Sequence, residues 1–204
     1  MHDGLRALIR LSAALAAGEP TAFREALGGA AAVADPLAVE EVLLQSYLFL
    51  GYPAALRALG EWRALTGRPA PAARRDEAEW ERRGAATCAT VYGGQYPRLR
   101  DNIAALHPDM ERWMIVEGYG KVLSRPGLDL AGRELCIVAL LAPQDAAPQL
   151  YSHLRGALNA GAATADVDEA VRIIDPLLPA GRRHQLQAQW SAVLERRGSS
   201  STGG

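Results

Sequence analysis

The strongest constraint on the fold is an almost wholly apolar run, LAGRELCIVALLA, at residues 130–142. Asp129 stands before the run as a helix cap, and Pro143 ends it. A helix that is apolar on most sides must be covered by other elements. The run therefore predicts a buried helix in a packed domain. Glu134, inside the run, is expected either in a buried ion pair or at a functional site.

The composition also favours helices. Hydrophobic residues make up 49% of the chain but aromatic residues only 6%, and alanine, the best helix former, is abundant. The formal net charge of -1, with arginines spread along the chain, gives no electrostatic argument for a nucleic-acid partner. No apolar run reaches the length needed to span a membrane. Two cysteines, Cys88 and Cys136, have neither disulfide-framework nor metal spacing, which predicts reduced thiols in a cytoplasmic protein.

Apolar periodicity and turn residues predict further helices on both sides of this run. In the first half they cover about 4–17, 21–33, 36–51 and 53–67, with Gly51 as a stop and Pro53 as a restart. In the second half they cover 108–123, the segment from Pro148 to Asn159, and about 182–196. Residues 68–76 (RPAPAARRD) have no apolar periodicity and are expected to form a linker.

The two ends of the chain resemble each other and indicate an internal duplication. One copy starts at Arg6 and the other at Arg133, and each leads from an apolar helix through a proline break to an acidic-capped helix. The predicted domains are a degenerate first repeat (1–67), a linker and connecting segment (68–107), a second repeat carrying the site (108–196) and a disordered tail (197–204). In the first repeat, Ala7 stands where the second has Glu134, and Glu25 or Ala26 stands where it has His153, so one functional pocket per chain is expected.

Three stretches carry a family resemblance: GYGKVLSRPGLDLAGRELCIVALLA, QLYSHLRGALNAGAATADVDEAV and, in the first half, EEVLLQSYLFLGYPAALRAL. Together they resemble the carboxymuconolactone decarboxylase family of the AhpD-like superfamily over roughly residues 5–65 and 108–178. The resemblance implies an all-α, AhpD-like helical fold whose members assemble into rings. A tandem chain looks like two fused subunits, which implies a homo-oligomer, either a trimer imitating a hexamer or a dimer.

The resemblance implies two candidate chemistries. Decarboxylase members act on a small lactone carboxylate without a cofactor. Peroxidase members use a Cys-x-x-Cys pair followed four residues later by histidine, with a glutamate upstream. Here His153 and Glu134 match the histidine and the glutamate, whereas Ala146 and Gln149 stand at the cysteine positions. No reducible pair can form there, so the resemblance favours a lyase over a thiol peroxidase.

The predicted catalytic residues are His153 and Glu134. A histidine can give or take a proton near neutral pH, and a neighbouring carboxylate can orient it. A guanidinium can hold a substrate carboxylate bidentately, and a phenol can donate to a substrate oxygen. The predicted substrate-binding residues are Arg133, Arg125, Tyr119 and Tyr151. The pocket is expected to be completed by residues 47–53 or by a neighbouring subunit.

Other interpretations stay open at this point. His153 can be a hydrogen-bonded interior histidine, and the chain a ligand-binding or assembly protein of the same fold without catalysis. A residual redox role of Cys136 is a third alternative, although a small core side chain is the plainer interpretation. The four histidines have no metal-ligand spacing. The expected partner is therefore a small-molecule substrate, with no cofactor, metal, nucleic acid or membrane.

Overall fold

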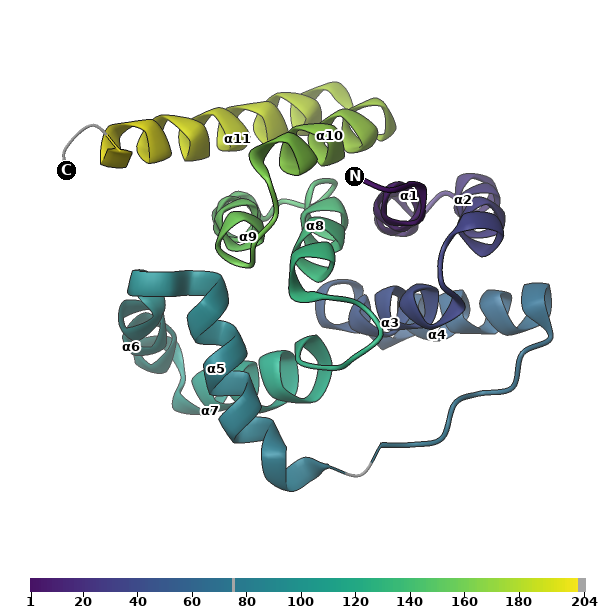
Figure 1. Cartoon of the computed structure of the whole chain (residues 1–204), viewed down its shortest axis with the longest axis horizontal. Helices are drawn as coiled ribbons and strands as arrows, with labels where there is room; N and C mark the ends of the chain where they lie inside the picture. The colour runs from purple at the N-terminus through teal and green to yellow at the C-terminus, as the bar shows by residue number, and fades with distance from the viewer. Residues whose placement is uncertain (75, 202–204) are drawn as a thin grey trace.

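The computed structural model describes residues 1–74 and 76–201, and this part of the chain is helical, with no strand in it (Figure 1). The α-helices are α1 (Asp3–Ala17), α2 (Pro20–Val33), α3 (Pro36–Gln45), α4 (Tyr47–Thr66), α5 (Trp80–Tyr92), α6 (Tyr96–Leu106), α7 (Pro108–Trp113), α8 (Leu130–Leu141), α9 (Ala147–Asn159), α10 (Thr164–Ile174) and α11 (Ala180–Ser201). A π-helix, η3 (Met114–Leu123), follows α7, and the short 3₁₀ helices are η1 (Glu77–Glu79), η2 (Gly93–Gln95) and η4 (Asp175–Leu177). The all-α fold class is confirmed.

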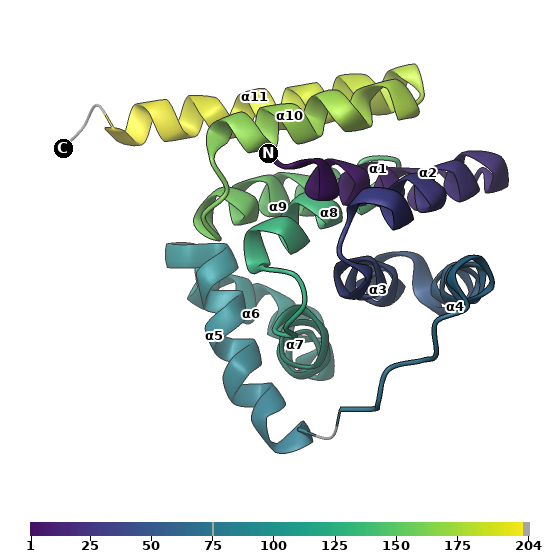
Figure 2. The same ribbon diagram turned by 45° about the vertical axis from the view of Figure 1, so that its right-hand side comes forward.

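The middle layer of the molecule consists of two helix pairs, α1 with α2 and α8 with α9. The pairs meet where α1 packs on α8. Helices α10 and α11 cover this layer on one side, and α3 and α4 lie on the other (Figures 1 and 2). The pair α1 and α2 lies in the predicted first repeat, and the pair α8 and α9 lies in the predicted second repeat. The internal duplication and the domain boundaries themselves stay predictions.

Helix α8 is the buried helix that the apolar run predicts. Every residue from Gly132 to Leu141 is buried. Each fully buried Leu, Ile or Val side chain stabilises the fold by roughly 1.5–3 kcal/mol relative to exposure. Asp129 caps the helix as predicted, because its carboxylate accepts a hydrogen bond from the Gly132 amide at 2.7 Å. The cap and the apolar packing together fix the position of Glu134 within the core.

The chain changes direction sharply between α3 and α4. The helix predicted over 36–51 ends earlier, at Gln45, and the axes of α3 and α4 differ by 116°. Gly51 then interrupts α4 with φ 79° and ψ 167°, a conformation that favours glycine, and Pro53 restarts the helix as predicted. The turn between the two breaks directs Tyr47 to Glu117 of η3, with 2.9 Å between their oxygens.

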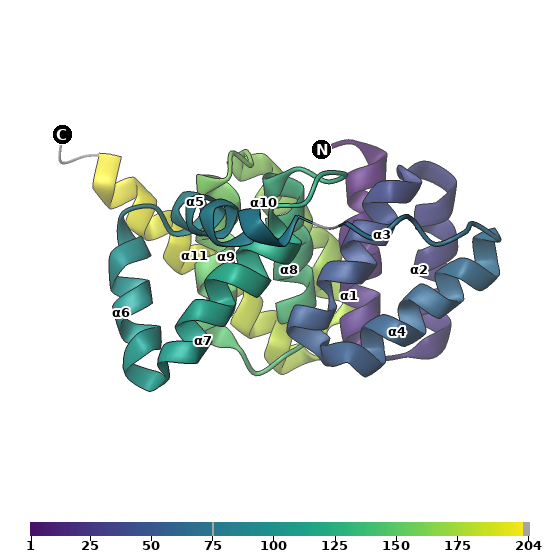
Figure 3. The same ribbon diagram turned by 90° about the horizontal axis from the view of Figure 1, so that it is seen from below.

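The segment predicted as a connection, 68–107, contributes to the core through α5. This helix packs closely along η3 and also contacts α9 (Figure 3). A Cβ atom on Gly84 would overlap the carbonyl oxygen of Ile115, and one on Gly120 would overlap that of Trp80. The two glycines therefore allow the backbones of α5 and η3 to approach more closely than other residues would permit.

The C-terminal segment is helical for longer than the sequence predicts. Helix α11 continues through Ser201, where the prediction is a disordered tail over 197–204. The hydroxyl of Ser199 donates to the carbonyls of Glu195 and Arg196, a local pairing that is compatible with a continuing helix. The remainder of the predicted tail, 202–204, lies outside the described residues.

Within the described chain, no single helix is long and apolar enough to cross a membrane. Helices α3 and α4 taken together have the length and composition, but the 116° bend separates them and most of α3 is buried in the protein.

Candidate functional site

The structure brings together the two predicted catalytic residues from neighbouring helices of the middle layer. Nδ1 of His153, on α9, lies 2.8 Å from Oε2 of Glu134, on α8. Glu134 is fully buried and His153 is 6% exposed. Gly156, one turn beyond His153, makes room for the carboxylate, because a Cβ atom there would lie 2.6 Å from Oε2 of Glu134. The pair is thus held in a tightly packed, low-dielectric setting, where charge interactions are strong.

The second oxygen of Glu134 is the unusual atom of this pair. Its Oε1 is buried and has no hydrogen-bond partner among the described residues. An unpaired buried carboxylate oxygen costs free energy, and native proteins have few such groups. This oxygen is therefore buried at an unfavourable free energy next to His153, a side chain that can carry a proton.

Three weakly acidic side chains surround Glu134. Burial raises the pKa of the Cys88 thiol to about 12 and that of the Tyr92 hydroxyl to about 12, and the negative charge of Glu134 adds to both shifts. Burial also raises the pKa of Tyr119 well above its ordinary value. The rings of Tyr92 and Tyr119 meet edge to face, with centroids 6.3 Å apart. All three groups are therefore protonated near neutral pH, and Glu134 has no charged neighbour in this cluster.

An aromatic ring from the first half of the chain covers His153. Phe49 meets the imidazole edge to face, with ring centroids 5.9 Å apart. Phe49 belongs to the 47–53 segment that the sequence assigns to completing the pocket, although the sequence does not single out this residue. Cys88 and Tyr92 are also missing from the predicted site, because only the packing of α5 against α9 brings them to Glu134.

Arg133 and Arg125, the predicted carboxylate anchors, are occupied within the protein. Nη2 of the fully buried Arg133 lies 2.9 Å from Oε2 of Glu41, and Arg125 donates to both oxygens of the same carboxylate at 2.8–3.0 Å. Arg133 also donates to the carbonyls of Leu128 and Pro126. The structure therefore shows these arginines joining α3 to the turn before α8, and not at His153.

The two predicted tyrosines differ in position. Tyr119 is buried in the cluster around Glu134. Tyr151, two residues before His153 on α9, is contacted instead by the guanidinium groups of Arg155 and Arg196, which lie 6.0 and 5.3 Å from its ring centroid. The structure therefore gathers Tyr119, but not Tyr151, with the catalytic pair.

The predicted alternative of a redox-active Cys136 is at odds with its environment. The residue is fully buried, and burial raises the pKa of its thiol to about 12. A protonated, inaccessible thiol is a poor nucleophile. Among residues 1–74 and 76–201, no three His, Cys, Asp or Glu side chains gather where they could hold a metal ion.

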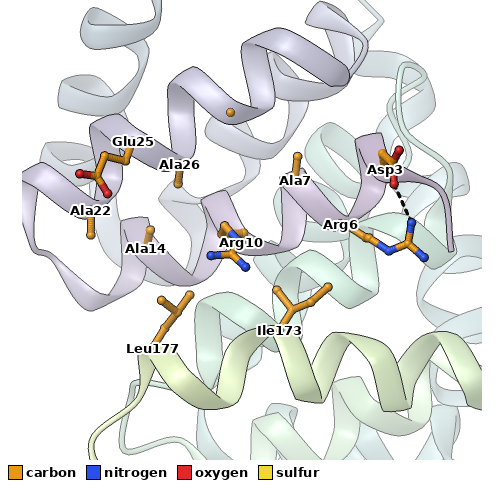
Figure 4. Close-up of a pocket in the computed structure, with 11 residues that line it drawn as sticks. Asp3, Arg6, Ala7, Arg10, Ala14, Ala22, Glu25, Ala26, Ile173 and Leu177 are labelled. Atoms are coloured by element: carbon orange, nitrogen blue, oxygen red, sulfur yellow. Dashed lines mark hydrogen bonds and ion pairs between the residues drawn. The ribbon is translucent and has the colours of Figure 1, made fainter.

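An open cavity of about 470 Å³ lies in the first half of the chain, between α1, α2 and the end of α10 (Figure 4). Ala7, Glu25 and Ala26 line it, and these are the positions that the predicted duplication equates with Glu134 and His153. The acid–base pair of the second half has no counterpart there, because Ala7 carries no functional group.

Comparisons with known proteins match the part of the chain that carries the pair. The sequence model of the carboxymuconolactone decarboxylase family matches residues 109–182, which contain both members of the pair. The chain is 32% identical over 140 residues to peroxisomal protein 2 of Schizosaccharomyces pombe, covering 66% of each protein. It is 38% identical over 85 residues to peroxisomal protein 2 of Saccharomyces cerevisiae, covering 41% of this chain and 29% of that protein.

Proposed function

Because the chain belongs to the carboxymuconolactone decarboxylase family, we propose that Glu134 and His153 form the acid–base pair of a cofactor-free decarboxylase. The substrate is a small carboxylated lactone or a related enol acid. The observation that carries the proposal is the buried 2.8 Å contact between the two side chains, together with the unpaired second oxygen of Glu134.

The proposed reaction is balanced without an oxidant or a reductant. The bond between the substrate carboxylate and the ring carbon breaks, carbon dioxide leaves, and the electron pair moves into a dienolate conjugated with the lactone carbonyl. His153 then donates a proton to the dienolate carbon and recovers a proton from solvent. Glu134 holds the imidazole through Nδ1, which leaves Nε2 as the donor toward substrate.

The surroundings of His153 suit a decarboxylation. Phe49 places an apolar ring against the imidazole, and both predicted arginine anchors are bound to Glu41, so neither arginine neutralises a substrate carboxylate at the histidine. A substrate carboxylate in such a setting loses its hydration, whereas the dienolate spreads its charge over several atoms. An apolar wall therefore favours loss of carbon dioxide over retention of the carboxylate.

The test uses the purified chain with carboxymuconolactone and a panel of small lactone and enol acids, with release of carbon dioxide as the readout. His153→Gln and Glu134→Gln are expected to lower kcat by about 10²–10⁴-fold, the usual contribution of a positioned acid or base. His184→Gln is the matched control, because His184 is exposed on α11. Circular dichroism confirms that each variant is folded. Full turnover by His153→Gln would overturn the proposal.

One observation favours a second candidate, a ligand-binding or assembly protein of this fold without catalysis. Five cavities of the described chain are lined by other residues than Glu134 and His153, and His153 is only 6% exposed, so none of these cavities presents the pair to a ligand. The same panel separates the two candidates. Tight binding of a lactone acid by the wild-type chain without any product would favour this second function.

Assembly and location are further proposals. We retain the expected homo-oligomer, a trimer or a dimer, and sedimentation analysis of the purified chain tests it. The names of the two yeast relatives place those proteins in the peroxisome, which makes a peroxisomal location the rival of the cytoplasmic one predicted from the sequence. Imaging of the tagged full-length protein in its native cell decides between the two locations.

A further inference from the structure

Four arginines from three separate stretches of the sequence line one cavity of about 550 Å³. They come from three helices, Arg98 from α6, Arg155 from α9, and Arg196 and Arg197 from α11. Helix α6 and the C-terminal end of α11 lie on the same side of the molecule (Figures 1 and 3). The sequence predicts arginines spread without a focus, and this expectation is wrong at this cavity because the tertiary fold collects them.

The lining of this cavity contains no carboxylate. Gln95 and Asn159 add polar groups, and the remaining two lining residues are apolar. Within the described part of the chain, no ion pair joins Arg98, Arg155 or Arg197 to an acidic residue, whereas Arg6, Arg24, Arg63 and Arg100 elsewhere are each paired with one. Like charges gathered in one concave site repel one another, and a bound anion relieves this repulsion.

We propose that this cavity binds a small molecule bearing phosphate groups, at a site separate from Glu134 and His153. Arginine forms paired, planar hydrogen bonds to phosphate oxygens, which suits several guanidiniums around one ligand. The volume lies within the range of small-molecule sites, about 300–1,000 Å³. The arginines come from three helices, so a ligand with two or more linked phosphates can contact more of them than orthophosphate can.

Two of the arginines are held in place before any ligand binds. The guanidinium of Arg155 lies over the ring of Tyr151, 6.0 Å from the centroid, and Arg196 lies over the same ring at 5.3 Å. Such cation–π contacts restrict the arginine side chains. This arrangement gives Tyr151 the role of a support for the anion site.

The experiment is an isothermal titration of the full chain with inorganic pyrophosphate, and with orthophosphate for comparison. Saturable 1:1 binding is expected, tighter for pyrophosphate, and weakened at least tenfold in the Arg98→Gln/Arg155→Gln double variant. The matched control is Arg57→Gln/Arg172→Gln, which removes two exposed arginines of α4 and α10 and is expected to bind as the wild type does. Thermal unfolding checks that both double variants are folded.

Absence of saturable binding at millimolar pyrophosphate would overturn the proposal. Equal weakening of pyrophosphate binding in the two double variants would also overturn it, because it would indicate non-specific attraction to positive charge. Tight binding of a single-stranded RNA that pyrophosphate does not displace would also overturn it, in favour of a nucleic-acid surface. His153→Gln is expected to bind pyrophosphate normally. The outcome is therefore independent of the proposed decarboxylase activity.

Discussion

Glu134 and His153 lie on adjacent core helices with Oε2 and Nδ1 2.8 Å apart, and the closeness of α8 and α9 at this point depends on Gly156. A Cβ atom at position 156 would lie 2.6 Å from Oε2 of Glu134 and 2.7 Å from Cγ1 of Val91. The acid–base pair and the contact between α5, α8 and α9 thus depend on the absence of a side chain at Gly156.

Gly156→Ala is therefore expected to destabilise the protein by about 1–3 kcal/mol, the usual cost of overpacking a core, and to displace Glu134 from His153. Gly28→Ala is the matched control, because a Cβ atom at that site in α2 meets nothing within 4 Å. Replacing glycine by alanine inside an open helix stabilises by about 0.5–1 kcal/mol. Urea unfolding of both variants measures the contrast, and equal stabilities would show that α8 and α9 are not in close contact at this position.

The contact between α5 and η3 gives a similar prediction. Gly120→Ala places a methyl group on the carbonyl of Trp80, so the melting temperature is expected to fall by several degrees, corresponding to a loss of about 1–3 kcal/mol. Gly118→Ala, in the same π-helix but with open space around its Cβ position, is expected to leave the melting temperature nearly unchanged. If the two variants have the same melting temperature, α5 does not pack closely on η3 at Gly120.

Arg133 gives a prediction that separates a structural role from substrate binding. Arg133→Met leaves the buried Glu41 with only Arg125 as an ionic partner, and breaking a buried pair in this way costs about 3–5 kcal/mol. Arg57→Met, at an exposed site, is expected to change stability by less than about 0.5 kcal/mol. A stable Arg133→Met protein with a raised KM would instead support the substrate-anchor role predicted from the sequence.

The two buried thiols give a prediction about alkaline pH. In the folded chain burial raises the pKa of Cys88 and of Cys136 to about 12, above the ordinary thiol value. As pH rises between these values, the unfolded chain loses thiol protons that the folded chain keeps, so the free energy of unfolding falls. Below the ordinary value both states are protonated and this contribution is constant.

The Cys88→Ala/Cys136→Ala variant is therefore expected to lose less stability than the wild type between pH 8 and pH 10.5. Urea unfolding at the two pH values measures the difference. The wild-type thiols are also expected to react with a disulfide reagent at pH 8 only after unfolding. An unchanged pH slope together with rapid labelling of the folded chain would show that the thiols are accessible.

Local signals in the sequence were sufficient for most of the fold. The apolar run and the cap at Asp129 predict α8, and Gly51 with Pro53 predicts the break in α4. The pair of Glu134 and His153 follows from the family resemblance, because the two residues match positions of one motif. Features that depend on short-range pattern or on a motif could therefore be predicted.

Features that depend on long-range packing could not be predicted. Glu41, on the distant helix α3, forms ion pairs with Arg125 and Arg133, and no local sequence pattern indicates this pairing. The role of Gly84 becomes visible only when the backbone of η3 lies against α5. The arginine cavity likewise depends on how the tertiary fold places α6, α9 and α11 next to one another.

The most direct test of the central claim is the decarboxylation of carboxymuconolactone in D₂O, with the position of deuterium in the product determined by NMR. If His153 delivers the proton, the wild-type product carries one deuterium on a single face of the dienolate carbon that is protonated, and His153→Gln forms almost no product. Deuterium on both faces, or the same single-face labelling at an undiminished rate in His153→Gln, would contradict the assignment of His153 and Glu134 as the acid–base pair.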